Sequence, residues 1–139
     1  MITPFQFKRI PAQTTTVFDP TWDTLIEVGV PVGQVGHVYV DFRATIQVQY
    51  TEASSTFLGA TVRLLFDDEV LVDNAFIDFD PAFGPPNIDT YAGVVPLQSL
   101  IENVAPGPHK LEVQWSCNAE HESATIFPGS ATLLIEGKS

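Results

Sequence analysis

The residues of this sequence best suited to metal or acid–base chemistry are three histidines, one cysteine and a run of acidic side chains. Cys117 and His121 form a Cys-x-x-x-His pair, flanked by Glu120 and Glu122, that could supply two zinc ligands. A structural zinc site takes four protein ligands, and the sequence contains no second cysteine. The alternation of this segment also places Cys117 on an apolar face, where a thiol is usually inert. We therefore predict neither a zinc site nor a reactive thiol.

The histidines are also the only side chains that titrate near neutral pH and could act as general bases. None of the three lies beside a Gly-x-Ser-x-Gly turn or a similar nucleophile motif. Asp41 and Glu112 lie on the polar faces of predicted strands, and a carboxylate pair for glycoside cleavage is the remaining enzymatic option. Possession of acids alone does not identify such a pair. We predict that the protein is not an enzyme and uses no cofactor, with a small hydrolase as the third-ranked hypothesis.

The stretch from Asp67 to Asp89 is strongly acidic and contains no Lys or Arg. Carboxylate and amide oxygens are the ligands that calcium takes. The spacing matches no calcium-binding loop, however, and Asp67-Asp68-Glu69 is typical of a hairpin turn. We predict solvated turns here and no bound metal, and a calcium site is the alternative.

Three aromatic residues are candidates for contact with a partner, because a rigid ring offers a large contact area. Trp22 lies outside any clear core pattern, while Phe83 and Tyr91 flank a Pro-rich loop. Packing of these rings under the loops is the alternative.

The elements that must position these residues are predicted by alternation of apolar and polar side chains. Residues 36–50 alternate strictly, which predicts a long strand with one face in a core. Further strands separated by turn-forming residues, and the lack of any 3.6-residue period, predict an all-β antiparallel sandwich of about eight strands. These further strands are expected at residues 21–30, 57–66, 69–79, 92–104, 109–118, 123–127 and 130–137.

The chain is long enough for one core, which we assign to a single domain at residues 21–139. Residues 1–20 contain prolines that remove ladder donors, so this segment is either an edge strand or an arm that packs on a partner. The candidates for that contact are Phe5, Phe7, Lys8 and Arg9.

The overall charge restricts the partners. Six Lys plus Arg against seventeen Asp plus Glu give a formal net charge of −11, which repels nucleic acid and anionic lipid. No apolar run is long enough to span a membrane, and no secretory signal is visible. We expect neither nucleic acid nor a membrane as partner. A single cysteine excludes an intrachain disulfide and suits a reducing compartment, or a particle assembled inside one.

The end of the chain resembles the closing hairpins of jelly-roll domains of the tumour-necrosis-factor and complement globular-head type. One family strand, Gly-x-His/Tyr-x-Val/Leu-x-Val-x-Trp, is matched by Gly107, His109, Leu111, Val113 and Trp115. The final family strand is matched by Gly129, Ser130, Leu133, Ile135 and Glu136. The resemblance covers residues 104–137 and implies a jelly roll that usually associates as a trimer and serves in recognition or as a structural cap.

Related jelly rolls occur in bacteriophage virions as head decoration and fibre proteins, and the lack of a collagen-like stalk or a disulfide favours that setting. The first hypothesis is therefore a structural virion component, a homotrimer that binds a capsid protein and is assembled in the host cytoplasm. The alternative is a carbohydrate- or receptor-binding β-sandwich module, calcium-assisted in one version, with residues 67–91 as its tip.

Overall fold

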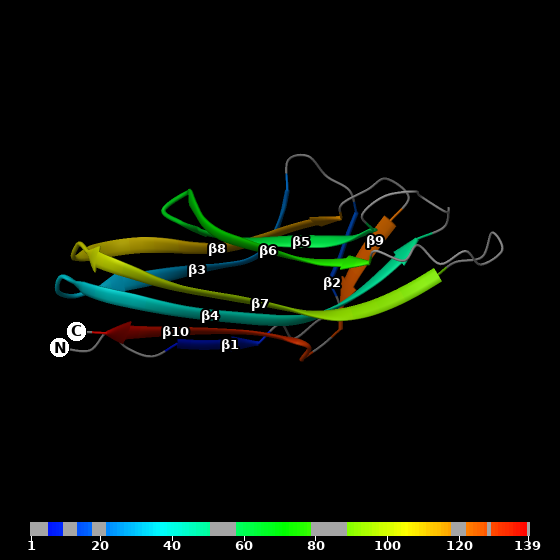
Figure 1. Ribbon diagram of the computed structural model, residues 1–139. Helices are drawn as coiled ribbons and strands as arrows, with labels where there is room; N and C mark the ends of the chain where they lie inside the picture. Colours follow the sequence, from blue (N-terminus) through cyan, green and yellow to red (C-terminus); the bar gives the residue numbers. More distant parts are fainter. Residues whose placement is uncertain are drawn as a thin grey trace.

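The computed structural model describes residues 6–9, 14–17, 22–50, 58–78, 89–117, 122–127 and 129–138. Within these ranges the chain forms two antiparallel sheets that lie face to face, which confirms the predicted all-β sandwich (Figure 1). The larger sheet contains β1 (Gln6–Arg9), β2 (Thr14–Val17), β4 (Gly36–Tyr50), β7 (Asp89–Val104), β9 (Glu122–Ile126) and β10 (Ala131–Lys138). The smaller sheet contains β3 (Asp23–Val32), β5 (Leu58–Phe66), β6 (Glu69–Asp78) and β8 (Gly107–Cys117).

The larger sheet is organised around β4, which is long enough to pair with two successive strands along one edge. β10 pairs with residues 37–44 of β4 and β9 with residues 47–50, so β9 and β10 act as one interrupted strand. The Thr45 amide donates to the Ser130 carbonyl at 2.9 Å and bridges the interruption. β1 pairs with β10 and β2 pairs with β9, so β1 and β2 form a second interrupted strand at the edge of the sheet.

Counting each interrupted strand once gives four strand positions in either sheet. The order is then β7, β4, β9/β10, β1/β2 in the larger sheet and β3, β8, β5, β6 in the smaller sheet. Successive strands cross repeatedly between the sheets, which is the eight-strand arrangement of a jelly roll. All eight strands predicted at residues 21–137 are present, and β1 and β2 are the two further segments.

The core consists of the inward-facing residues of both sheets, as the period-two pattern predicts. Trp115 is 1% exposed near the end of β8, and the thiol of Cys117 is buried on the same face. Full burial of each large apolar side chain contributes about 1.5–3 kcal/mol, so the core supplies most of the stabilisation. β4 contributes Val38, Val40, Phe42, Ala44, Ile46 and Val48.

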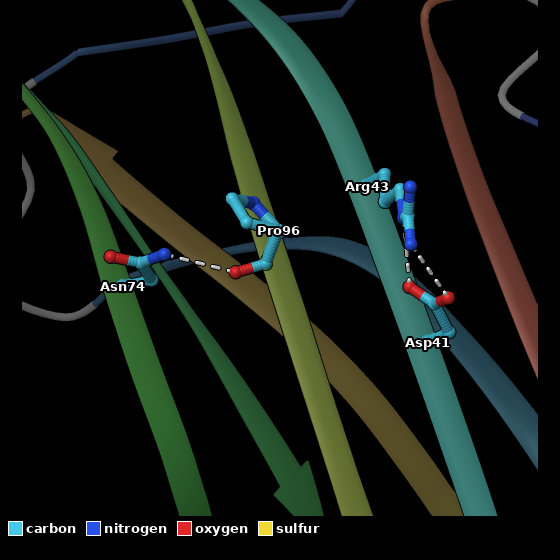
Figure 2. Close-up of polar contacts among 4 residues, drawn as sticks. All are labelled: Asp41, Arg43, Asn74 and Pro96. Carbon is cyan, nitrogen blue, oxygen red and sulfur yellow. Dashed lines mark hydrogen bonds and ion pairs between the residues drawn. The ribbon is translucent and has the colours of Figure 1, made fainter.

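The two sheets are joined by a hydrogen bond at the edge where β6 meets β7. The Asn74 side chain of β6 donates from Nδ2 to the carbonyl oxygen of Pro96 in β7 at 3.0 Å (Figure 2). β7 pairs with β4 on its other edge, and Pro96 has no amide hydrogen to contribute to a ladder. The Pro96 carbonyl points away from β4, so proline is tolerated in this strand. Its carbonyl oxygen is therefore available to accept the hydrogen bond from Asn74 of the other sheet.

The described residues include no helix long and apolar enough to cross a membrane.

Candidate functional site

The most unusual polar group of the described residues lies on the outward face of β8, the strand at the centre of the smaller sheet. Glu112 alternates with the core residues of β8, yet it is only 7% exposed. Burying a carboxylate is costly unless it receives hydrogen bonds. The Thr24 hydroxyl donates to its Oε2 at 2.5 Å, and Gln114 Nε2 donates to the same oxygen at 3.0 Å. The hydrogen bond from Thr24 is the main cause that lowers the pKa of Glu112, against the opposing effect of burial.

The hydrogen bonds continue from Gln114 across to the neighbouring strand β5. Arg63 donates from Nε to Gln114 Oε1 at 2.8 Å. Its guanidinium carbon lies 4.2 Å from the ring centroid of Trp22, at the start of β3. Stacking of this kind holds both groups in place, since the cation is attracted to the face of the ring. We call the five residues Trp22, Thr24, Arg63, Glu112 and Gln114 the β8 polar strip.

The sheet register explains why these residues meet. Gln114 of β8 lies directly opposite Thr24 of β3 on one side and opposite Arg63 of β5 on the other. A bulge follows Thr24 near the start of β3, and Trp22 directly precedes this strand. Bulges commonly re-aim a side chain at the end of a ladder.

Trp22 has an unfavourable backbone conformation. Its φ of 62° lies in the left-handed region, which is a genuine outlier for a bulky side chain. Such a conformation costs on the order of 1–3 kcal/mol and persists only where the surroundings hold it. Strained residues of this kind cluster at binding sites, so the strain marks Trp22 as a candidate for function.

The β8 polar strip leaves both donors and an acceptor for a ligand. Among the described residues, Glu112 Oε1 and the two terminal nitrogens of Arg63 have no hydrogen-bond partner. Buried carboxylate oxygens normally receive at least one hydrogen bond, so Oε1 is suited to a donor from outside the chain. A carboxylate with a lowered pKa is poorly suited to act as a general acid at neutral pH. The strip therefore offers hydrogen-bond donors and an acceptor to a ligand.

A second cluster lies at the end of the smaller sheet, where the turn between β5 and β6 contacts β8. His109 has Nδ1 at 2.6 Å from Asp67 Oδ2, and Lys110 has Nζ at 2.5 Å from Asp68 Oδ1. The Lys110 amide donates to Asp67 Oδ1 at 2.9 Å. Asp67 and Asp68 form the hairpin turn that the sequence predicts, and their carboxylates are bound to β8. Within the described residues no group of three or more His, Cys, Asp or Glu could hold a metal ion.

The two carboxylates considered for glycoside cleavage do not meet. Asp41 lies on the outward face of the larger sheet, where it forms an ion pair with Arg43 at 3.3 Å (Figure 2). Glu112 lies on the outward face of the other sheet. The core separates the two carboxylates, so they cannot act on one bond.

Of the predicted contact residues, Trp22 is the one whose side chain the structure describes. The backbone of β1 places Phe7 opposite Leu134 and Arg9 opposite Thr132, at the edge of the larger sheet. Lys8 lies between them in β1. Tyr91 of β7 lies opposite Val48 of β4. Phe5 and Phe83 fall outside the described residues.

The sequence pattern did not show that four members of the strip lie together: Thr24, Arg63, Glu112 and Gln114. Alternation places Glu112 and Gln114 together on an outward face, and this was the available signal. Thr24 and Arg63 lie on other strands, and no local pattern shows that these strands flank β8.

No protein-family model matches the chain, and no curated protein matches it. Among solved structures, it is similar to dimeric latent PorU from Porphyromonas gingivalis, with 6% identity, a TM-score of 0.50 and 97% of this chain covered. The chain spans only 12% of that protein's length. It is also similar to the CBM36-1 domain of a multidomain xylanase from the hindgut metagenome of Trinervitermes trinervoides, with 12% identity, a TM-score of 0.47 and 98% of both chains covered. At these identities the likeness concerns the fold alone.

Proposed function

We propose that the protein is a non-enzymatic carbohydrate-binding module and that the β8 polar strip is its binding surface. The observation that carries the proposal is the buried Glu112 carboxylate, which has one oxygen fixed by two donors and one oxygen without a donor among the described residues. A saccharide hydroxyl supplies the missing donor. The terminal nitrogens of Arg63 then donate to other hydroxyl oxygens of the same ligand.

The strip is well prepared for such a ligand, because its side chains already hold one another. The Arg63 guanidinium is fixed by Gln114 on one side and by the Trp22 ring on the other. Groups fixed before binding lose less conformational entropy when the ligand arrives. Trp22 also provides an apolar surface beside the polar groups, as ligand sites commonly do.

The test is binding to a glycan array, followed by calorimetry with the ligand that binds best. It compares two variants, each of which removes one arginine from a different sheet. Arg63→Ala should weaken binding at least about tenfold, because it removes charge-assisted hydrogen bonds worth about 1.5–3 kcal/mol. Arg43→Ala is the matched control, since Arg43 lies on the outward face of the opposite sheet, and it should bind as the native chain does. Equal binding by both variants, or no glycan bound by the native protein, refutes the proposal.

A structural role in an oligomeric particle is the second candidate, in the form of a bacteriophage virion component that assembles in the host cytoplasm. The observation that favours it is the exposure of Val94 (66%) and Leu100 (51%) on the outward side of β7, beside β4. These apolar side chains would be removed from water if an assembly covered this face. We assign the covering surface to further copies of this chain.

Light scattering of the purified protein at moderate salt tests this second candidate. The expected mass is that of a trimer, and the variant with Val94→Lys and Leu100→Lys should have the mass of a monomer. A monomeric native protein, or an unchanged oligomer in the double variant, counts against it.

A further inference from the structure

The charges around Glu112 favour a cationic group in the ligand. Glu27 lies directly opposite Glu112 in the register of β3 and β8, and like charges in that position repel each other. Asp73 lies directly opposite Arg63 in the register of β5 and β6. Lys110, whose ammonium group is bound to Asp68 at 2.5 Å, also attracts Glu27 and Glu112. Among the described residues of this face, the acidic side chains Glu27, Asp68, Asp73 and Glu112 outnumber the basic side chains Arg63 and Lys110.

The free oxygen of Glu112 shows where a cation would be received. Glu112 is more than nine-tenths buried, and both donors that reach it, Thr24 and Gln114, bind Oε2. A neutral hydroxyl satisfies Oε1 with a hydrogen bond in which the carboxylate is the one charged partner. An ammonium group adds a second, opposite charge to that bond and also offsets the negative charge that Glu27, Asp68 and Glu112 place on this face.

We infer that the saccharide bound by the β8 polar strip carries a free amino group, which donates to Glu112 Oε1. This inference rests on the proposed carbohydrate-binding function and specifies its ligand class. An acidic saccharide is disfavoured on the same face, because its carboxylate would meet the carboxylates of Glu27 and Glu112. In the part of the chain that the structure describes, Arg63 is the cation of this face that is not ion-paired to the Asp68 turn. N-acetylation of the ligand removes the charge and should remove the preference.

Calorimetry with the full chain and four oligosaccharides of equal length tests the inference. The probes are glucosamine pentamer, N-acetylglucosamine pentamer, cellopentaose and a pentameric uronate. We expect the glucosamine pentamer to bind about tenfold more tightly than cellopentaose, and the uronate not to bind at all. The acetylated pentamer should bind no more tightly than cellopentaose.

Two matched variants separate a specific amine site from general attraction to an acidic protein. Glu112→Gln should abolish the preference for glucosamine, whereas Asp41→Asn makes the same change of charge on the opposite sheet and should keep it. Glu27→Gln is the substitute test if Glu112→Gln does not fold, because it alters an exposed side chain that the fold does not need. It should reduce the preference for glucosamine about threefold.

The outcomes distinguish the inference from the proposed function. Equal affinity for glucosamine and cellopentaose overturns the inference and leaves the carbohydrate-binding function intact. The inference is also overturned if Glu112→Gln keeps the preference for glucosamine, or if Asp41→Asn loses that preference to the same extent. Either result would show that the net charge of the protein attracts the ligand. Failure of every oligosaccharide to bind overturns both.

Discussion

The two ring nitrogens of His109 both lie within hydrogen-bonding distance of acceptors: Nδ1 is 2.6 Å from Asp67 Oδ2, and Nε2 is 2.7 Å from the Ala105 carbonyl oxygen. A neutral imidazole has one N–H and can donate to only one of them. Both bonds therefore require the charged imidazolium. The ring also stacks on Phe66, with centroids 5.2 Å apart, so the contact joins the β5–β6 turn, β8 and the segment before it.

We expect the stability of the protein to fall as the pH rises above about 6.5, the ordinary pKa of histidine. The hydrogen bond with Asp67 is the main cause that raises the pKa of His109 above its ordinary value of about 6.5. The contribution of a group with a raised pKa is fully present below its unfolded value and is lost as the pH rises through the folded value. Thermal melting between pH 5 and pH 9, compared with His109→Gln, isolates this contribution. An identical pH profile in the variant would contradict it.

The same pair predicts a loss of stability in acid. The hydrogen bond from His109 is the main cause that lowers the pKa of Asp67 below its ordinary value of 3.8. The contribution of Asp67 is fully present above that ordinary value and disappears as the pH falls through the lowered one. Melting of Asp67→Asn should therefore depend less on pH below about 4 than melting of the native chain does. Equal slopes would show that the bond adds nothing to stability.

The β5–β6 turn should be stabilised by glycine at position 68 relative to alanine. Asp68 has a φ of 68°, a conformation that glycine adopts freely and alanine does not. Both substitutions remove the ion pair with Lys110, so the difference between them reports the backbone at position 68 and not the ion pair. Asp68→Gly should be more stable than Asp68→Ala by roughly 1 kcal/mol, measured by urea denaturation. A more stable Asp68→Ala would mean that the turn has another conformation in solution.

The hydrogen bond between the two sheets should contribute a small but measurable amount. Asn74→Ala removes the donor to the Pro96 carbonyl, whose bond should contribute about 0.5–1.5 kcal/mol, and also the Oδ1 acceptor of the Ala75 amide. Pro96→Ala keeps the acceptor and is the control, with a smaller expected change in the urea midpoint. If Pro96→Ala lowered the stability more than Asn74→Ala, the proline ring and not the hydrogen bond would be the stabilising feature.

The two tryptophans should differ in what their truncation changes. Trp115 is 1% exposed in the core, and Trp115→Ala should cost about 3–5 kcal/mol. Trp22→Gly releases the strain of a positive φ, so it should be more stable than Trp22→Ala while both lose glycan binding. Denaturation and calorimetry on the three variants measure both effects. Retention of binding in Trp22→Gly would remove Trp22 from the site.

Much of the fold can be predicted from the sequence, because the alternation of side chains along a strand is a local property. The pattern of residues 36–50 assigns one set of side chains to the core, and Val40 and Phe42 are fully buried. The same pattern places Cys117 and Trp115 inward. It could not show that Glu112, on the polar side of its strand, is nine-tenths buried, since that depends on the neighbouring strands.

The strands and the side of each strand that faces the core follow from the local order of residues, because the pleat repeats every two residues. That β3 and β5 flank β8 follows from the packing of the two sheets. Thr24 lies 88 residues from Glu112 in the chain, and Arg63 lies 51 residues from Gln114. Contacts of that separation are set by how the strands cross between two sheets, and this crossing depends on the packing of the whole core.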